Sequence, residues 1–447
     1  MLQRARLLWA VIPSAAVLAS PAHAAERELD EGPAPSSARE IETPIERMIT
    51  RPPEERPPLL PWLSQPLQKL PPFFADTRLD VRFRTYYLRN DRTDGVLSEA
   101  WAMGGSIHYR SGWLEDLFAV RLEAFTSQPI VAPNDRDDTL LLAPEQEGYS
   151  VLGIANGTLR YKGIFLTGGR LYLDLPYVNR DDNRMTPNTF EAIRLEKPEG
   201  EFEFVTGYAW NFKERNSDEF VSFAEAAGVN KERGLAYGGV LWDPNENFHF
   251  GLFTGVVPDL SGRAYGELGG GRDLGDGWEA RLDGQFSYKF EVGDELLGDA
   301  ADDNWNLGIR ASVSKTGAVF RLGLGIAESS AQDRDDYGGS ALYVDLMQRT
   351  FNRPDEKVLL ASVSYDFSGI GVYGLSAIVN FAAGFDGKVD GRRSDAQEVD
   401  VTIDYHVKKG WLKSFWLRVR GSWLNDELAD RDGTDVRVIL RYDLPAI

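Results

Sequence analysis

Arginine side chains spaced two residues apart are the groups in this sequence best suited to binding chemistry. Such pairs occur at Arg82 and Arg84 and at Arg418 and Arg420, and Arg437 follows soon after the second pair. A guanidinium group can bind a carboxylate through two parallel hydrogen bonds. A surface carrying several of them would concentrate small anions. The predicted basic ladder consists of Arg78, Arg82, Arg84, Arg110, Arg418, Arg420, Arg437 and Arg441. Within it, Arg82, Arg84, Arg418 and Arg437 are the first choices for contact with a solute.

An alternative role for the same arginines is structural. Acidic residues with matching spacing could hold them in a mesh of ion pairs, and both roles could hold at once. The acidic residues in question are Asp80, Asp366, Glu398, Asp400 and Asp404. The formal net charge of the chain is −20, which argues against nucleic acid or anionic lipid as the main partner. Acidic loops could equally favour cations, so the charge preference for solutes stays open.

A second polar cluster lies between residues 172 and 188. It offers mixed charge and hydrogen-bonding groups suited to a constriction in a channel, namely Tyr177, Arg180, Asp181, Asp182, Asn183 and Arg184. Oxygen ligands in this run also suggest a surface calcium site, but their spacing does not match a known calcium loop. Simple solvated surface is the other alternative.

Signals for catalysis are weak. The chain has no cysteine, and its histidines beyond the N-terminal region are His108, His249 and His406. Neither a nucleophile elbow, a phosphate-binding glycine loop nor a zinc signature is present. We therefore predict no catalytic residue, no metal site and no cofactor.

The arginines lie in long runs in which apolar and polar residues alternate strictly, and the structure of these runs must position them. From Trp278 to Phe290, apolar residues such as Leu282 and Phe286 alternate with charged or polar ones such as Arg281 and Asp283. Only an extended strand sends successive side chains to opposite faces. Strands of this length, with charges on one face, fit a membrane barrel with a wet lumen better than a soluble sandwich. The pattern predicts an all-β, transmembrane antiparallel barrel of about 18 strands with short periplasmic turns and long extracellular loops. A glycine-rich stretch at 263–271 is predicted to be a strand, and 339–350 to belong to a loop.

The N-terminal region differs in composition. Arg4 and Arg6 precede an apolar run and then Ala22-His23-Ala24, which predicts a signal peptide over 1–24. Prolines dominate 25–76, which is expected to be a periplasmic extension serving as a flexible tether or as a binding segment. Residues 62–74 are apolar enough to dock against another surface. The barrel is predicted over 77–447, in the outer membrane of a Gram-negative bacterium.

Several stretches resemble the OprD-type substrate-specific porins. They include Leu79-Asp-Val-Arg-Phe-Arg-Thr-Tyr-Tyr-Leu88, Gly168-Gly-Arg170, Asp182-Asn-Arg-Met-Thr-Pro-Asn-Thr-Phe190, Phe351-Asn-Arg-Pro-Asp-Glu-Lys357 and Tyr365-Asp-Phe367. The resemblance implies an 18-stranded barrel, monomeric or weakly associated. It also implies a third extracellular loop that folds inward, and an arginine ladder that guides carboxylate-bearing solutes. Asp174 departs from the family pattern, because a basic residue often precedes the proline of that loop.

These observations together predict passive diffusion of small polar solutes, with amino acids, organic or aromatic acids and short peptides as the expected classes. A structural or adhesive barrel is the alternative, and an outer-membrane hydrolase a further one. The expected surroundings are outer-membrane lipid and lipopolysaccharide, with insertion by the barrel-assembly machinery.

Overall fold

A computed structural model describes residues 59–297, 303–328, 337–427 and 432–447. These residues all fall within one compact unit, 32–447. The predicted signal peptide and the first part of the proline-rich extension lie outside the described residues.

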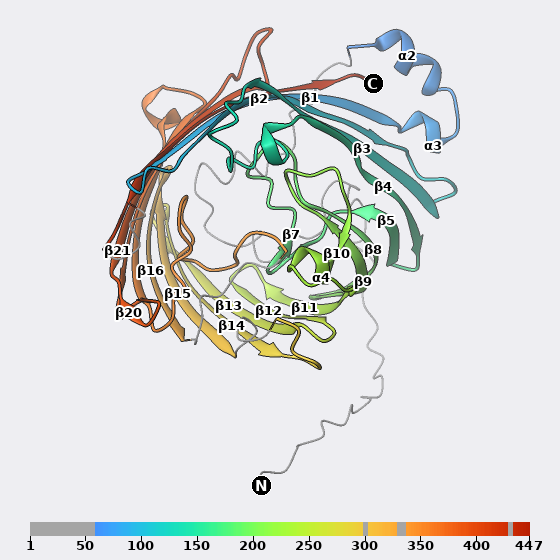
Figure 1. Cartoon of the computed structure of the whole chain (residues 1–447). Coiled ribbons are helices and arrows are strands. Elements are labelled where there is room, and N and C mark those ends of the chain that lie inside the picture. Colours follow the sequence, from blue (N-terminus) through green and yellow to red (C-terminus); the bar gives the residue numbers. More distant parts are fainter. Residues whose placement is uncertain (1–58, 298–302, 329–336, 428–431) are drawn as a thin grey trace. The chain divides into compact units, whose positions relative to one another are not determined.

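The described residues form a closed antiparallel barrel of eighteen long strands (Figure 1). Closure follows from strand β1, which pairs with β2 on one side and with the last strand, β23, on the other. The strands are β1 (Arg78–Arg92), β2 (Leu97–Arg110), β3 (Phe118–Val131), β4 (Tyr149–Tyr161), β5 (Ile164–Leu171), β8 (Thr189–Glu199), β9 (Phe202–Lys213), β11 (Leu235–Asn245), β12 (Phe248–Val257), β13 (Ser261–Gly275), β14 (Trp278–Glu291), β15 (Asn304–Lys315), β16 (Ala318–Glu328), β17 (Lys357–Asp366), β18 (Leu375–Phe385), β21 (Ala396–His406), β22 (Phe415–Asp426) and β23 (Gly433–Pro445).

Several short elements lie outside the eighteen barrel strands. The short strand β10 (Val221–Ser222) pairs with β9. The remaining elements are the hairpins β6 (Asp174–Leu175) with β7 (Val178–Asn179) and β19 (Lys388–Val389) with β20 (Arg392–Arg393), the helices α2 (Pro61–Leu67), α3 (Pro72–Ala75) and α4 (Phe223–Ala226), and the 3₁₀ turns η2 (Pro144–Gln146) and η4 (Phe367–Ile370). No helix among the described residues is long and apolar enough to cross a membrane.

Side chains alternate between the two faces of the wall as the sequence predicts. In β14, Leu282 and Phe286 are exposed on the outer face, whereas Arg281, Asp283 and Gln285 are buried on the inner face. The glycine-rich stretch predicted at 263–271 lies inside β13, where the lack of side chains does not interrupt pairing with β12 and β14. The fold class and the strand count are therefore confirmed.

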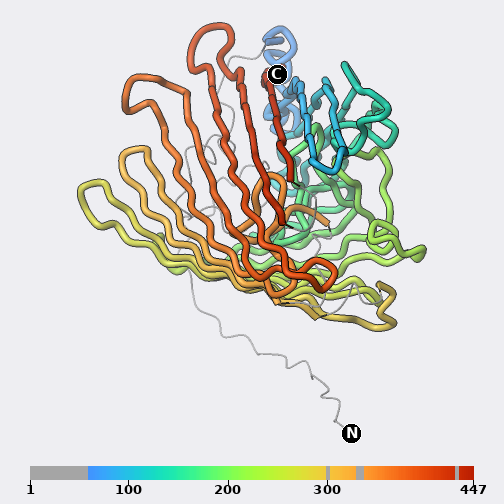
Figure 2. Tube along the Cα trace, turned by 60° about the vertical axis from the view of Figure 1, so that its left-hand side comes forward, coloured from blue at the N-terminus to red at the C-terminus, as the bar shows by residue number. Residues whose placement is uncertain are grey.

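Connections also alternate in length (Figure 2). Residues 162–163, 200–201, 246–247, 276–277 and 316–317 make tight turns, whereas the opposite strand ends carry the long loops. Two connections on the loop side are nevertheless short, at 93–96 and 258–260. The predicted loop at 339–350 is confirmed.

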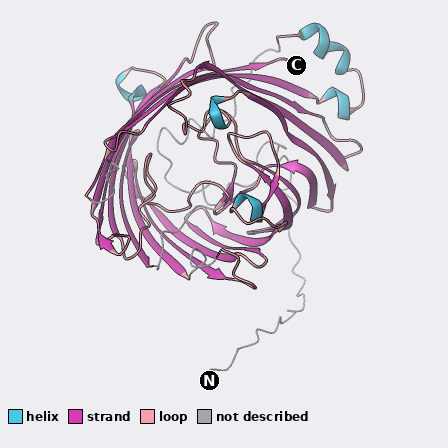
Figure 3. Ribbon diagram, viewed as in Figure 1, coloured by secondary structure: helices cyan, strands magenta, loops and turns pink. Residues whose placement is uncertain are grey.

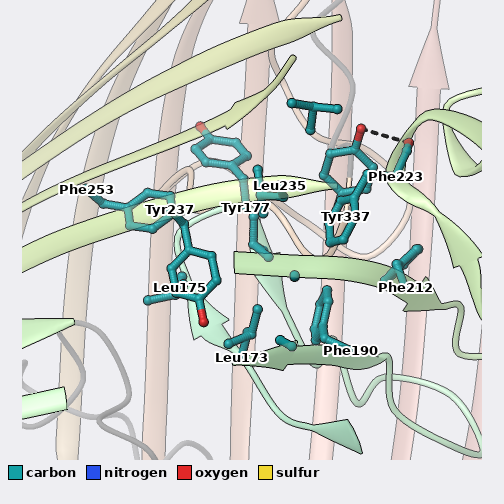
Figure 4. Packing of buried hydrophobic residues seen from close by; sticks show 14 of the residues in the cluster. Leu173, Leu175, Tyr177, Phe190, Phe212, Phe223, Leu235, Tyr237, Phe253 and Tyr337 are labelled. Carbon is teal, nitrogen blue, oxygen red and sulfur yellow. Dashed lines mark hydrogen bonds between the residues drawn. The ribbon is translucent and has the colours of Figure 1, made fainter. Parts of the chain in front are cut away.

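Four long loops enter the ring of strands (Figure 3). We call them L2 (132–148), L3 (172–188), L4 (214–234) and L7 (337–356, the described part of the β16–β17 connection). L3, L4 and L7 share an apolar core against the wall (Figure 4). In it, the ring of Phe223 in L4 lies 4.6 Å from the ring of Tyr337 in L7, measured between centroids. The Tyr337 hydroxyl donates to the Phe223 carbonyl at 3.1 Å. Burial of apolar side chains therefore holds these loops inside the lumen.

The apolar stretch expected to dock, 62–74, covers most of α2 and α3, which lie beside the barrel rim. The Leu59 and Leu60 amides donate to the carbonyls of Pro445 and Ala446, and the Gly112 amide donates to the Phe73 carbonyl. The part of the N-terminal extension that the structure describes is thus tied to the barrel at both of its ends.

Candidate functional site

Sheet register brings the predicted arginines onto one inner wall. β1, β22 and β23 are adjacent, and in their pairing Arg84 lies opposite Arg441 and Arg420 lies opposite Arg437. Like charges directly opposite each other destabilise a sheet unless something compensates them. The ladder therefore needs nearby acidic groups or bound anions.

Acidic partners accompany all four first-choice arginines. Arg82 donates to Asp443 at 2.8 Å, and Arg418 donates to both oxygens of Asp404 at 2.7 and 2.6 Å. Arg437 donates to both oxygens of Asp435 at 2.7 and 3.0 Å and also to the Met347 carbonyl of L7. Arg84 binds Asp182 of L3. The mesh of ion pairs considered as an alternative is therefore present, and solute contact by these four stays a prediction.

The other predicted ladder residues are placed as follows. Arg441 pairs with Asp443 at 2.6 Å, and Arg110 lies 4.0 Å from Asp80 and opposite Arg78 in the sheet. Of the expected acidic partners, Asp366 instead accepts from the Ser368 amide. Glu398 and Asp400 accept the amides of Gln348 and Met347 in L7.

Neither Arg184 nor Arg420 forms an ion pair with a described residue. Arg420 donates only to the Thr402 hydroxyl at 3.1 Å. Arg184 of L3 donates to the Thr139 carbonyl at 2.9 Å and to Asn183. Both lie close enough to Arg437 to be repelled by its charge. We call Arg184, Arg420 and Arg437 the arginine cluster. Of its three members only Arg437 forms an ion pair, with Asp435, so the cluster carries excess positive charge, which an anion would stabilise.

L3 reaches across the lumen from β5 to β1. Arg84 donates to the Asp182 carboxylate at 2.6 and 3.1 Å and to the Arg184 carbonyl at 2.6 Å. Partial burial acts to raise the pKa of Asp182, but the charge and hydrogen bonds of Arg84 outweigh it and lower the pKa below its ordinary value. The inward fold of L3 predicted by the resemblance is therefore present.

The remaining polar residues of L3 are used within the loops or against the wall. Tyr177 is buried, and its hydroxyl donates to Ser287 of β14 at 3.1 Å. Arg180 forms an ion pair with Asp174, and Asp181 forms one with Arg215 of L4. Asn183 accepts from Arg215 at 2.9 Å. The acidic residue that departs from the family pattern thus neutralises a cation of the same loop.

The base of L7 carries a buried charge network that the sequence did not reveal as a site. Arg353 donates to Asp426 of β22 at 3.0 and 2.5 Å. Arg349 donates to Glu356 at 2.5 Å, and the Arg353 amide donates to the same carboxylate at 2.9 Å. Two of these residues, Arg353 and Glu356, lie in the stretch Phe351–Lys357 that carried the resemblance. Their geometry shows that the motif fixes L7 to the wall.

Further basic residues line the opposite wall and were missed as site candidates. Arg281 donates to Asp283 at 2.6 Å, and Arg310 reaches the same carboxylate at 3.4 Å. The Arg263 guanidinium lies 4.0 Å from the centre of the Tyr177 ring. In the sequence these arginines alternate with apolar residues, as the ladder arginines do. The same alternation would therefore have identified them as facing the lumen.

One polar trio has the order of a hydrolase site. Ser106 Oγ lies 2.6 Å from His108 Nε2, and His108 Nδ1 lies 3.0 Å from Glu123. Acyl transfer also needs free N–H donors beside the nucleophile. Ser106 lies in the middle of β2, paired with Arg82 of β1 and Phe125 of β3, so the surrounding backbone serves the sheet. Across the described ranges, no group of three or more His, Asp or Glu side chains could hold a metal ion.

Comparison with solved structures supports the fold. OccK9 (OpdG) of Pseudomonas aeruginosa has a TM-score of 0.77 and 23% identity, covering 84% of this chain and 100% of its own. A BenF-like porin from Pseudomonas fluorescens has a TM-score of 0.77 and 18% identity, with 83% and 100% covered. Pseudomonas aeruginosa OpdK, solved with vanillate, has a TM-score of 0.76 and 23% identity, again with 83% and 100% covered.

Sequence comparison identifies the family. A search of the curated proteins found no match. The family model described as outer membrane porin, OprD family, matches residues 71–446. This match spans the whole barrel, including the arginine wall, L3 and L7. The chain is therefore a member of the OprD family of outer-membrane porins.

Proposed function

We propose that this porin lets small carboxylate-bearing solutes diffuse passively through its lumen, with the arginine cluster as their contact. The observation that carries the proposal is the positive charge of Arg184 and Arg420, neither of which forms an ion pair with a described acidic side chain. A carboxylate entering between L3 and β22 would relieve the repulsion with Arg437. The ion pairs of Arg82, Arg84 and Arg418 keep the rest of the wall rigid.

Matched solutes test this proposal. Propionate and propionamide have nearly the same size but differ in charge, and their entry into vesicles can be followed by swelling. Arg420→Gln should slow propionate about tenfold, because one solvated charge-assisted hydrogen bond contributes about 1.5 kcal/mol. Propionamide should be unaffected. Arg89→Gln is the control, since Arg89 lies on the outward side of β1 and its loss changes the net charge equally. Equal slowing of both solutes would contradict the proposal.

A structural or adhesive barrel is the competing function. Conductance across a planar bilayer separates the two, because a channel gives single-channel current steps. Purified, folded protein that gave no such steps would remove the transport proposal altogether. We further propose that the chain has no catalytic role, since the Ser106 trio lies within paired strands.

A further inference from the structure

The segment 59–76 carries large apolar side chains that the barrel leaves uncovered. Trp62 is 68% exposed, Leu59 56%, Leu70 47% and Phe74 46%. Neither α2 nor α3 contains a buried residue. Figure 1 shows both helices outside the ring of strands, next to the C-terminal end of β23. Exposed apolar clusters of this kind mark contact surfaces.

Hydrogen bonds fix this segment to the rim, so its exposure is not that of a loose tail. Leu59 and Leu60 bond to Pro445 and Ala446, and Phe73 accepts from Gly112 in the β2–β3 turn. The fit at that turn is close, because a Cβ added to Gly112 would lie 2.1 Å from the Pro72 carbonyl oxygen. The apolar side chains are thereby held in one place relative to the wall.

The surface is continuous with the lipid-facing belt. The neighbouring β2–β3 turn exposes Leu114 and Leu117, and the outer face of β1 exposes Phe83. Other turns at the same end of the barrel expose aromatic rings, with Trp411 84% and Tyr373 70% exposed. Tryptophan and tyrosine favour the boundary between bilayer and water. Trp62 extends this aromatic belt beyond the strands.

The charge of the segment 59–76 is also compatible with contact to lipid. Lys69 and Asp76 are the only charged residues in 59–76, although the whole chain carries −20. A segment free of excess acid can approach phospholipid headgroups without repulsion. The family match begins at residue 71, so α2 lies outside the matched region.

We infer that α2 and α3 form an interfacial anchor, which places Trp62, Leu70 and Phe74 in the periplasmic leaflet of the outer membrane. The ligand is phospholipid, held by apolar contact at the depth of the headgroups and upper acyl chains. The anchor would add membrane contact beside the β1–β23 seam, where the barrel closes.

The absence of cysteine makes a direct test possible. Full-length protein carrying Trp62→Cys or Phe74→Cys is labelled with a nitroxide in phosphatidylethanolamine–phosphatidylglycerol vesicles. Collisions with oxygen, which enters lipid, are compared with collisions with a water-soluble nickel complex. Leu252→Cys on the outer face of β12 is the lipid reference, and Glu246→Cys in an exposed turn is the water reference.

The anchor predicts oxygen-to-nickel ratios at Trp62 and Phe74 closer to that at Leu252 than to that at Glu246. Ratios equal to that at Glu246 would overturn it. Spectral broadening that grows with the protein-to-lipid ratio would also overturn it, because a second copy would then cover the surface. If Trp62→Cys does not fold, Gln65→Cys, one turn further along α2, reports the same depth and keeps the tryptophan.

Discussion

Release of L3 from β1 should change the current through the pore. The latch is the Arg84–Asp182 pair, in which two hydrogen bonds of 2.6 and 3.1 Å join a nearly buried guanidinium to a carboxylate that is 30% exposed. Removing one partner of a fully buried pair costs about 3–5 kcal/mol. Asp182→Asn keeps one acceptor and faces lumen water, so we expect a cost of about 2 kcal/mol.

A cost of about 2 kcal/mol raises the population of the released loop about thirtyfold. Single-channel recording should show this as frequent excursions to larger conductance. Arg84→Met should have a greater effect, because Arg84 also donates to the carbonyls of Arg184 and Met185. Asp135→Asn in L2 removes the same charge from an exposed position and serves as the control.

Current traces of Asp182→Asn that match wild type in both conductance and open-state noise would refute the latch. An equal change in Asp135→Asn would assign the effect to net charge alone. In either case the inward position of L3 would depend on its apolar core and not on the ion pair.

Three further outcomes are expected. The pKa of Asp182 lies below its ordinary value of 3.8. The Arg84–Asp182 latch is therefore fully present above pH 3.8 and is lost as the pH falls through the lowered pKa. Single-channel noise should rise reversibly in acid, and Asp182→Asn should lack this rise. Glu356→Met removes the nearer carboxylate of Arg349 and leaves only Asp426, at 3.3 Å, so thermal unfolding should show a loss of about 3 kcal/mol. Arg393→Met, at a 64% exposed side chain, should change stability by less than about 1 kcal/mol. Phe223→Ala empties the centre of the core shared by L3, L4 and L7, and should cost about 3–5 kcal/mol, measured by unfolding or by faster protease cleavage of the loops; stability equal to wild type would mean that the core does not hold them.

Local regularities of the sequence determined the barrel. Two-residue alternation is a property of each extended strand by itself, so Leu282 and Arg281 could be assigned to opposite faces without knowing their neighbours. Turn residues such as Lys162 and Gly163 likewise mark the strand ends locally. The fold class and the approximate strand number could therefore be predicted from the chain alone.

Only the tertiary structure decided which arginines of the lumen form ion pairs. Arg82 meets Asp443 across 361 positions of sequence, and Arg84 meets Asp182 across 98. Such pairings depend on barrel closure and on the path of L3, which no local pattern encodes. The same reason explains why Arg420 keeps its charge uncompensated while Arg418, two residues away, does not. The sequence predicted the ladder, but the register and the loops decided which of its arginines have an acidic partner.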